Sequence, residues 1–159
     1  MTRKEQYNQL ILQIAELIKD ETNLVGILAN VSAALHDTFP ERFFWVGFYL
    51  QENGNMLRLG PFQGSVACYT IPFGKGVCGK AWEEGCTLIV PDVEKFPGHI
   101  ACSSLSRSEI VVPMYDDSHT FRGVLDIDST RLNDFNEDDK EGLERIIELL
   151  MAETQALFQ

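Results

Sequence analysis

The sequence contains no long apolar run and few basic residues. No stretch approaches the roughly 20 apolar residues that span a bilayer, and the first residues lead into an amphipathic pattern rather than an apolar signal core. The 13 lysine and arginine residues stand against 24 aspartate and glutamate residues, which gives a net charge of -11. A surface this acidic repels phosphate backbones and anionic headgroups. We therefore expect no nucleic-acid partner, no membrane partner and a cytoplasmic location.

Cysteine is scarce, and its spacing excludes the common paired motifs. Nine, seven and fifteen residues separate the four cysteines, Cys68, Cys78, Cys86 and Cys102. The sequence thus has no Cys-x-x-Cys pair of the kind that zinc knuckles and thioredoxin-type motifs use, and we expect no bound metal. Cytosolic thiols are kept reduced, so cysteines there indicate catalysis or redox cycling more often than permanent crosslinks. The alternative for any single cysteine is that it is simply a small apolar residue of the core.

Sequence context separates these cysteines. Cys78 lies at the expected start of a short helix between two lysines, where backbone N–H groups and positive charge would lower the thiol pKa below its free value of about 8.5. Cys102 lies in a long loop, three residues after His99, which could act as its partner. We predict that both are thiolates. Cys86 follows two glutamates, which oppose ionisation, and we expect it to be a small core residue.

Hydrophobic periodicity predicts helices at both ends of the chain and short strands between them. The predicted elements are helices over 10–18 and 24–35, a hairpin over 44–59, a strand over 66–71, a short helix within 74–85, a strand over 87–90, a hairpin over 109–127 and a helix over about 137–157. With 159 residues the chain is near the usual size of one domain. We expect a single α+β domain over residues 1–159, with about six antiparallel strands flanked by the terminal helices.

One glycine motif suggests a nucleotide site that we reject. Residues 74–79 read Gly-Lys-Gly-Val-Cys-Gly, a literal G-x-G-x-x-G. A dinucleotide site needs a parallel βαβ unit, and the predicted helix here is too short for one. These glycines more simply permit positive φ and close backbone packing around a pocket.

Three acidic residues interrupt apolar strands. Asp126 and Asp128 stand two apart on one predicted strand, so their side chains share a face. If Glu109 lies on a neighbouring strand, three carboxyl groups converge where charge is costly. Such a cluster could bind an ammonium group and keep one carboxyl protonated. A solvated sheet face is the alternative, and the sequence leaves both open.

Several motifs resemble one enzyme family. They occupy residues 60–64, 67–68, 74–79, 90–93, 97–102, 108–113 and 123–129, most of the chain after Phe43. Together they resemble the free methionine-(R)-sulfoxide reductases, which are single GAF-domain enzymes. The resemblance implies a GAF-like fold and reduction of free L-methionine-(R)-sulfoxide to L-methionine. It also implies a homodimer that binds no cofactor and takes electrons from thioredoxin.

The resemblance also implies roles for individual residues. Cys102 would be the attacking cysteine, Cys78 its resolving partner in an intramolecular disulfide, and Cys68 a further redox cysteine that relays oxidation. Attack on the sulfoxide would leave Cys102 as a sulfenic acid, and Cys78 would then condense with it to form the disulfide. The substrate pocket would be lined by Glu109, Asp126, Asp128 and Trp45.

A second hypothesis is a binding module rather than an enzyme. A GAF domain can sense a small ligand or an oxidant without turnover. Such a sensor normally acts through an output domain, and we expect no room for one in 159 residues. The reductase hypothesis depends on the sulfurs of Cys78 and Cys102 coming within bonding reach beside the acidic cluster.

Overall fold

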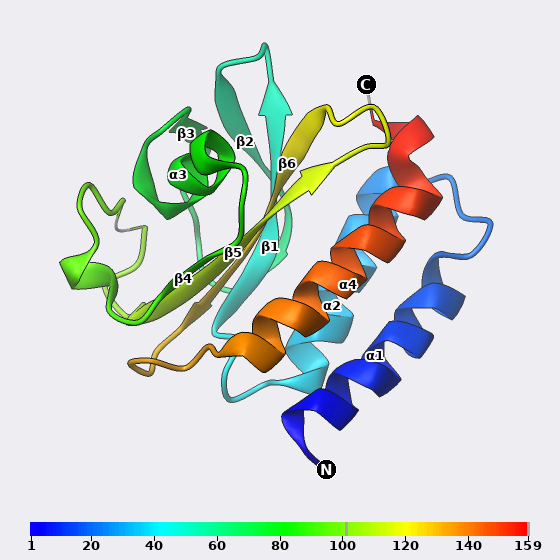
Figure 1. Cartoon of the computed structure of the whole chain (residues 1–159), viewed down its shortest axis with the longest axis horizontal. Helices are drawn as coiled ribbons and strands as arrows, with labels where there is room; N and C mark the ends of the chain where they lie inside the picture. The colour runs from blue at the N-terminus through cyan, green and yellow to red at the C-terminus, as the bar shows by residue number, and fades with distance from the viewer. Residues whose placement is uncertain (101, 159) are drawn as a thin grey trace.

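A six-stranded antiparallel sheet forms the centre of the computed structural model, which describes residues 1–100 and 102–158 (Figure 1). Its strand order is β3-β2-β1-β6-β5-β4. The strands are β1 Trp45–Glu52, β2 Met56–Gln63, β3 Thr70–Pro72, β4 Leu88–Val90, β5 Ser108–Tyr115 and β6 Phe121–Ser129. Every neighbouring pair runs antiparallel, which confirms the expected α+β architecture.

Three long helices cover one face of this sheet. They are α1 Arg3–Ile18, α2 Leu24–Thr38 and α4 Glu137–Thr154. In Figure 1, α2 and α4 lie on the sheet and α1 packs against both. The opposite face carries the short helix α3 Gly76–Glu84 and irregular segments, including the 3-10 turn η1 Val93–Lys95. A second 3-10 turn, η2 Gln155–Leu157, follows α4. None of the helices described combines the length and apolar character needed to cross a membrane.

Strand alternation divides the core between the two faces. On β5 and β6, Ile110, Val112, Leu125 and Ile127 are buried in the cluster that includes the three long helices. Val111 and Val124 belong to the cluster on the opposite face, together with residues of α3. Successive strand residues point to opposite sides. The polar residues between the helix-facing positions are therefore directed toward the side of the sheet that carries α3.

The structure confirms most predicted elements and corrects two. The terminal helices, both hairpins and the short glycine-bounded helix are present. The strand predicted over 66–71 is wrong for most of its length, because only Thr70–Pro72 pairs with β2. Side chains of β1 instead hydrogen-bond to the backbone of 65–68, which holds that segment away from the sheet edge. Leu157 lies in η2 rather than on the face of α4.

A buried charge network ties the ends of the domain together. Asp139, in the first turn of α4, is fully buried. It accepts hydrogen bonds from the Tyr7 hydroxyl at 2.6 Å, from Arg3 at 2.8 Å and from Arg42 at 3.0 Å. A buried carboxylate is stable only when it is paired in this way. The network therefore fixes α1 and the segment before β1 to the start of α4.

We expect Asp139→Ala to lower the free energy of unfolding by about 3 kcal/mol, because Arg42 and Tyr7 lose a buried partner. Urea denaturation measures this change. Asp37→Ala is the matched control, since that carboxylate is 83% exposed, and it should change stability by less than about 0.5 kcal/mol. Equal stability of the two variants would contradict a structural role for the network.

Candidate active site

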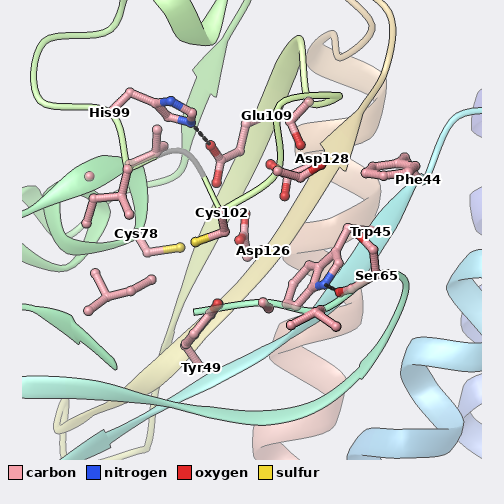
Figure 2. Close-up of a pocket in the computed structure, with 18 residues that line it drawn as sticks. Phe44, Trp45, Tyr49, Ser65, Cys78, His99, Cys102, Glu109, Asp126 and Asp128 are labelled. Carbon is pink, nitrogen blue, oxygen red and sulfur yellow. Dashed lines mark hydrogen bonds and ion pairs between the residues drawn. The ribbon is translucent and has the colours of Figure 1, made fainter. Parts of the chain in front are cut away.

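A pocket opens on the α3 side of the sheet (Figure 2). Its floor comes from β1, β5 and β6, and its walls come from the start of α3 and from residues near 65–67, 99–100 and 102–106. It brings together almost all the residues that the sequence analysis singled out for chemistry. Those that line it are Trp45, Cys78, His99, Cys102, Glu109, Asp126 and Asp128.

The register of β5 and β6 assembles the three carboxyl groups. Glu109 is the Cα partner of Asp128, and Asp126 follows two residues away on the same face. Glu109 and Asp126 are only 5% and 6% exposed, so the alternative of a solvated sheet face is wrong. Among the described residues, no hydrogen-bond partner contacts Asp126 Oδ1, although this atom is buried. The cluster thus presents an unsatisfied acceptor to the pocket.

Burial and mutual repulsion hold protons on this cluster. Burial, with a contribution from the charge of Asp128, raises the pKa of Glu109 to about 8. The pKa of Asp126 is raised well above its ordinary value by burial and by Glu109. The pKa of Asp128 is also raised well above its ordinary value, by burial and by the charge of Asp126. Glu109 is therefore mostly a neutral acid at pH 7, able to donate a proton.

His99 lies beside this acid. Its Nε2 is 3.6 Å from Glu109 Oε1, the contact drawn as a dashed line in Figure 2. Burial lowers the pKa of His99, so the ring is neutral at pH 7. The contact therefore joins two neutral groups rather than an ion pair. The sequence suggested Cys102 as the partner of His99, and the structure places the ring next to a carboxyl group instead.

The cysteines are arranged differently from the expectation. A disulfide joins Cys68 to Cys102, with a Cα–Cα distance of 5.7 Å across 34 residues of sequence. Cys78, the partner that the resemblance implied, is a free and buried thiol. In Figure 2 its sulfur and that of Cys102 point toward one another within the pocket. In the structure the partner of Cys102 is thus Cys68, whose backbone carbonyl accepts a hydrogen bond from the Tyr49 hydroxyl. The roles of Cys68 and Cys78 in turnover stay predictions.

Cys78 is not the activated thiolate that its position in the sequence suggested. Burial raises its pKa well above the ordinary value, and the negative charges of Asp126 and Glu109 raise it further. The neighbouring lysines do not offset this, because Lys75 is exposed and the Lys80 ammonium pairs with a glutamate outside the pocket. Acids distant in sequence therefore outweigh bases that are close in sequence.

Two further expectations about this region have clear outcomes. Cys86 is exposed, so its assignment as a small core residue is wrong. The glycines of 74–79 do serve close packing: Gly74 and Gly76 have positive φ, and a Cβ on Gly79 would lie 2.7 Å from the Pro72 carbonyl oxygen.

Strand β1 supplies the aromatic wall and anchors the mouth of the pocket. Trp45 is 4% exposed and stacks on Phe62, and its Nε1 donates a hydrogen bond to the Ser65 carbonyl at 3.0 Å. The Tyr49 hydroxyl donates to the Cys68 carbonyl at 3.1 Å. Sequence reasoning identified Trp45 but missed Tyr49. The available signal was its spacing, since residues four apart on a strand share a face.

Comparison with known proteins agrees with this geometry. The GAF domain family model matches residues 21–152. GAF domain-containing protein A of Dictyostelium discoideum is 56% identical over 94% of this chain and 92% of its own length. The free methionine-R-sulfoxide reductase of Saccharomyces cerevisiae is 42% identical, over 94% of this chain and 86% of its own. The free methionine-R-sulfoxide reductase of Neisseria meningitidis, solved in complex with its substrate, has a TM-score of 0.94 and 46% identity, covering 99% of this chain and 93% of its own.

The chain belongs to the GAF-domain free methionine-R-sulfoxide reductases. Membership in this family confirms the GAF fold and makes the protein an oxidoreductase. A relative with nearly the same fold, the Neisseria meningitidis enzyme, has been solved in complex with its substrate.

Some groups in the pocket of this reductase also have the spacing of metal ligands. One ligand atom each from Cys78, Glu109 and Asp126 lies within 4.8 Å of the other two. A thiolate and two carboxylates are donors that zinc accepts. The chemistry proposed below uses these groups without an ion, and the expectation that no metal is bound stays a prediction.

The cluster makes a measurable titration prediction for this reductase. We expect the Glu109 carboxyl carbon to titrate near pH 8, because burial and Asp128 disfavour its charged form. Carbon-detected NMR of protein labelled at glutamate side chains measures the pKa, and Glu109→Gln assigns the signal. A Glu109 midpoint near the ordinary glutamate value of about 4.3 would contradict the neutral acid.

Proposed function

We propose that this protein reduces free L-methionine-(R)-sulfoxide to L-methionine, with Cys102 as the nucleophile. The observation that carries the proposal is a cluster of three carboxyl groups, two of them buried, in a pocket that Cys102 of the disulfide pair also lines. Relatives that bear the name free methionine-R-sulfoxide reductase support it at 42% identity. The cluster and the cysteine pair together provide an amine-binding group, a proton donor and a redox-active sulfur in one enclosed space.

The acidic cluster explains selection of the free amino acid. A free substrate carries an α-ammonium group, whereas a methionine residue within a chain carries a neutral amide at that position. Asp126 Oδ1 is a buried acceptor that no described residue satisfies, and an ammonium group would supply the missing partner. A neutral amide would not supply this charged partner. Trp45, which lines the same pocket, then packs against the aliphatic side chain of the substrate.

The chemistry requires a nucleophile and a proton source. The Cys102 thiolate attacks the sulfoxide sulfur, and the sulfoxide oxygen must gain a proton before its bond to sulfur can break. Glu109, whose pKa of about 8 keeps it neutral at pH 7, lies in the same pocket and can donate that proton. Attack forms a bond between the Cys102 sulfur and the substrate sulfur, and the protonated oxygen leaves as water. Water then attacks the Cys102 sulfur, the sulfur–sulfur bond breaks, methionine leaves, and Cys102 remains as a sulfenic acid. The substrate is reduced by two electrons, and Cys102 is oxidised by two.

Resolution of the sulfenic acid is assigned to Cys68. Its thiol displaces water from the Cys102 sulfenic acid and forms the disulfide. The Cys68–Cys102 bond supports this assignment over Cys78, whose raised pKa disfavours the thiolate needed for attack. Cys78 then acts as a wall of the pocket next to Asp126. A dithiol donor must open the disulfide before the next turnover.

The remaining parts of the proposal concern partners and location. Thioredoxin is the electron donor, no cofactor is bound, and the protein acts as a homodimer in the cytoplasm. The disulfide supports a dithiol donor, because two electrons must enter through it. The family resemblance supports the homodimer and the location.

We expect Cys102→Ser to reduce turnover by at least about 1,000-fold, because the attacking sulfur is lost. NADPH consumption coupled to thioredoxin and thioredoxin reductase measures this on the separated epimers of free methionine sulfoxide. Cys86→Ser, which changes an exposed cysteine outside the pocket, is the matched control and should retain wild-type activity. Activity confined to the S epimer would overturn the proposed function.

Replacing either of the other two cysteines distinguishes the two candidates for resolution. We expect Cys68→Ser to release about one methionine per protein and then stop, with a Cys102 sulfenic acid that accumulates or over-oxidises. Cys78→Ser should continue past one equivalent, because Cys68 remains. Amino-acid analysis counts the methionine, and mass spectrometry after dimedone trapping detects the sulfenic acid. The reverse pattern would restore Cys78 as the resolving cysteine.

A further inference from the structure

Large apolar side chains stay exposed on both sides of the disulfide. Val66 and Tyr69, which flank Cys68 in sequence, are 87% and 77% exposed. Leu105, three residues after Cys102, is 60% exposed. Single exposed apolar residues are common on protein surfaces, but here they accompany both halves of one sulfur pair. We call Val66, Tyr69 and Leu105 the disulfide rim.

The backbone beneath the rim is held in place from inside the domain. Trp45 and Tyr49 hydrogen-bond to the carbonyl groups of Ser65 and Cys68, which fixes the segment that carries Val66 and Tyr69. The disulfide holds the Cα atom of Cys102, three residues before Leu105, 5.7 Å from that of Cys68. The part of the rim that carries Val66 and Tyr69 is therefore pre-organised, and binding to it orders little additional chain.

The location of the disulfide limits how electrons can reach it. On its inner side lie three carboxyl groups and Cys78, a buried thiol whose ionisation burial opposes. Thiol–disulfide exchange requires a thiolate to approach a sulfur. Cys102 is exposed and Cys68 is partly exposed, so a thiolate from outside can approach across the rim. A reductant that reaches either sulfur from outside therefore approaches the segments that carry the rim side chains.

We propose that the disulfide rim is the docking surface for a protein dithiol whose reactive thiol lies in an apolar surface. The proposal rests on the proposed function, since it concerns the step that regenerates the reduced enzyme. An anionic tripeptide thiol such as glutathione gains little from three apolar side chains and is repelled by a chain of net charge -11. A protein with apolar side chains around its thiol buries Tyr69 and Leu105 on contact, which is the main source of affinity in such interfaces.

The exchange step balances in two stages. The donor thiolate forms a bond to one sulfur of the pair, the Cys68–Cys102 bond breaks, and the other sulfur leaves as a thiolate that takes up a proton. The second donor thiol then loses its proton and attacks the donor sulfur of the mixed disulfide. The second cysteine is released, and the donor leaves as its own disulfide. Two electrons pass from donor to enzyme.

The test follows reduction of the disulfide alone, without methionine sulfoxide. Pre-oxidised protein is mixed with reduced thioredoxin or with dithiothreitol, and mass spectrometry after alkylation measures the release of the Cys68 and Cys102 thiols. For Tyr69→Ser/Leu105→Ser we expect the second-order rate constant with thioredoxin to fall about fivefold or more. The rate with dithiothreitol should stay within about twofold, because a small reductant buries little of the rim. Leu12→Ser, which changes a side chain 71% exposed on α1, is the matched control and should alter neither rate.

Two outcomes would overturn the rim proposal. An unchanged thioredoxin rate in Tyr69→Ser/Leu105→Ser would show that the rim does not contact the donor. Equal losses with both reductants would show that the rim tunes the disulfide itself rather than docking a protein. The proposed function is judged separately, because methionine release is measured in another assay. A rim-dependent reaction with thioredoxin, in a protein that fails to reduce methionine sulfoxide, would sustain the inference and overturn only the proposed substrate.

Discussion

The pairing of β5 with β6 is the constraint on which the site depends. This pairing sets Glu109 opposite Asp128 and places Asp126 on the same face. The register is strongly specified, because Ile110 and Ile127 on the other face are fully buried against the helices. A slip of one residue would turn the acids into the apolar core and the apolar residues into the pocket. Hydrophobic burial on one side of the sheet thus holds repelling carboxyl groups together on the other.

This forced proximity governs the sulfur chemistry as well as the acids. Burial and mutual repulsion raise the pKa values of Glu109, Asp126 and Asp128. Burial, and the carboxylate forms of these acids where they ionise, raise the pKa of the Cys78 thiol. The cysteine nearest the acids is therefore the least suited to act as a thiolate. The exposed Cys102 lines the pocket, and a disulfide joins it to the partly exposed Cys68. The acidic cluster thereby serves to bind an amine, while the reactive sulfur is that of a different cysteine, Cys102.

Sequence reasoning could predict the elements of this site but not its longest connections. The two-residue spacing of Asp126 and Asp128 already indicated a shared face, and hairpin signals placed Glu109 on a neighbouring strand. The disulfide partner of Cys102 could not be predicted from sequence, because it is 34 residues away and both Cys68 and Cys78 were candidates. The pKa of Cys78 was misjudged for the same reason, since local lysines are visible in sequence and distant acids are not. Residues close in sequence determine the periodicity that predicts helices and strands. The electrostatic environment of a side chain depends instead on tertiary contacts with residues distant in sequence.

The position of the disulfide also accounts for how one sulfur pair can serve two unlike reactants. On the inner side Cys102 lines a pocket with Glu109 and Asp126, which suits a small cationic substrate. Tyr69 and Leu105, close in sequence to the two cysteines, are exposed and suit an apolar protein surface. Because Cys102 is exposed, the large reductant need not enter the acidic pocket. Selectivity for the substrate and access for the donor are then set by different residues, and either can change in sequence without loss of the other.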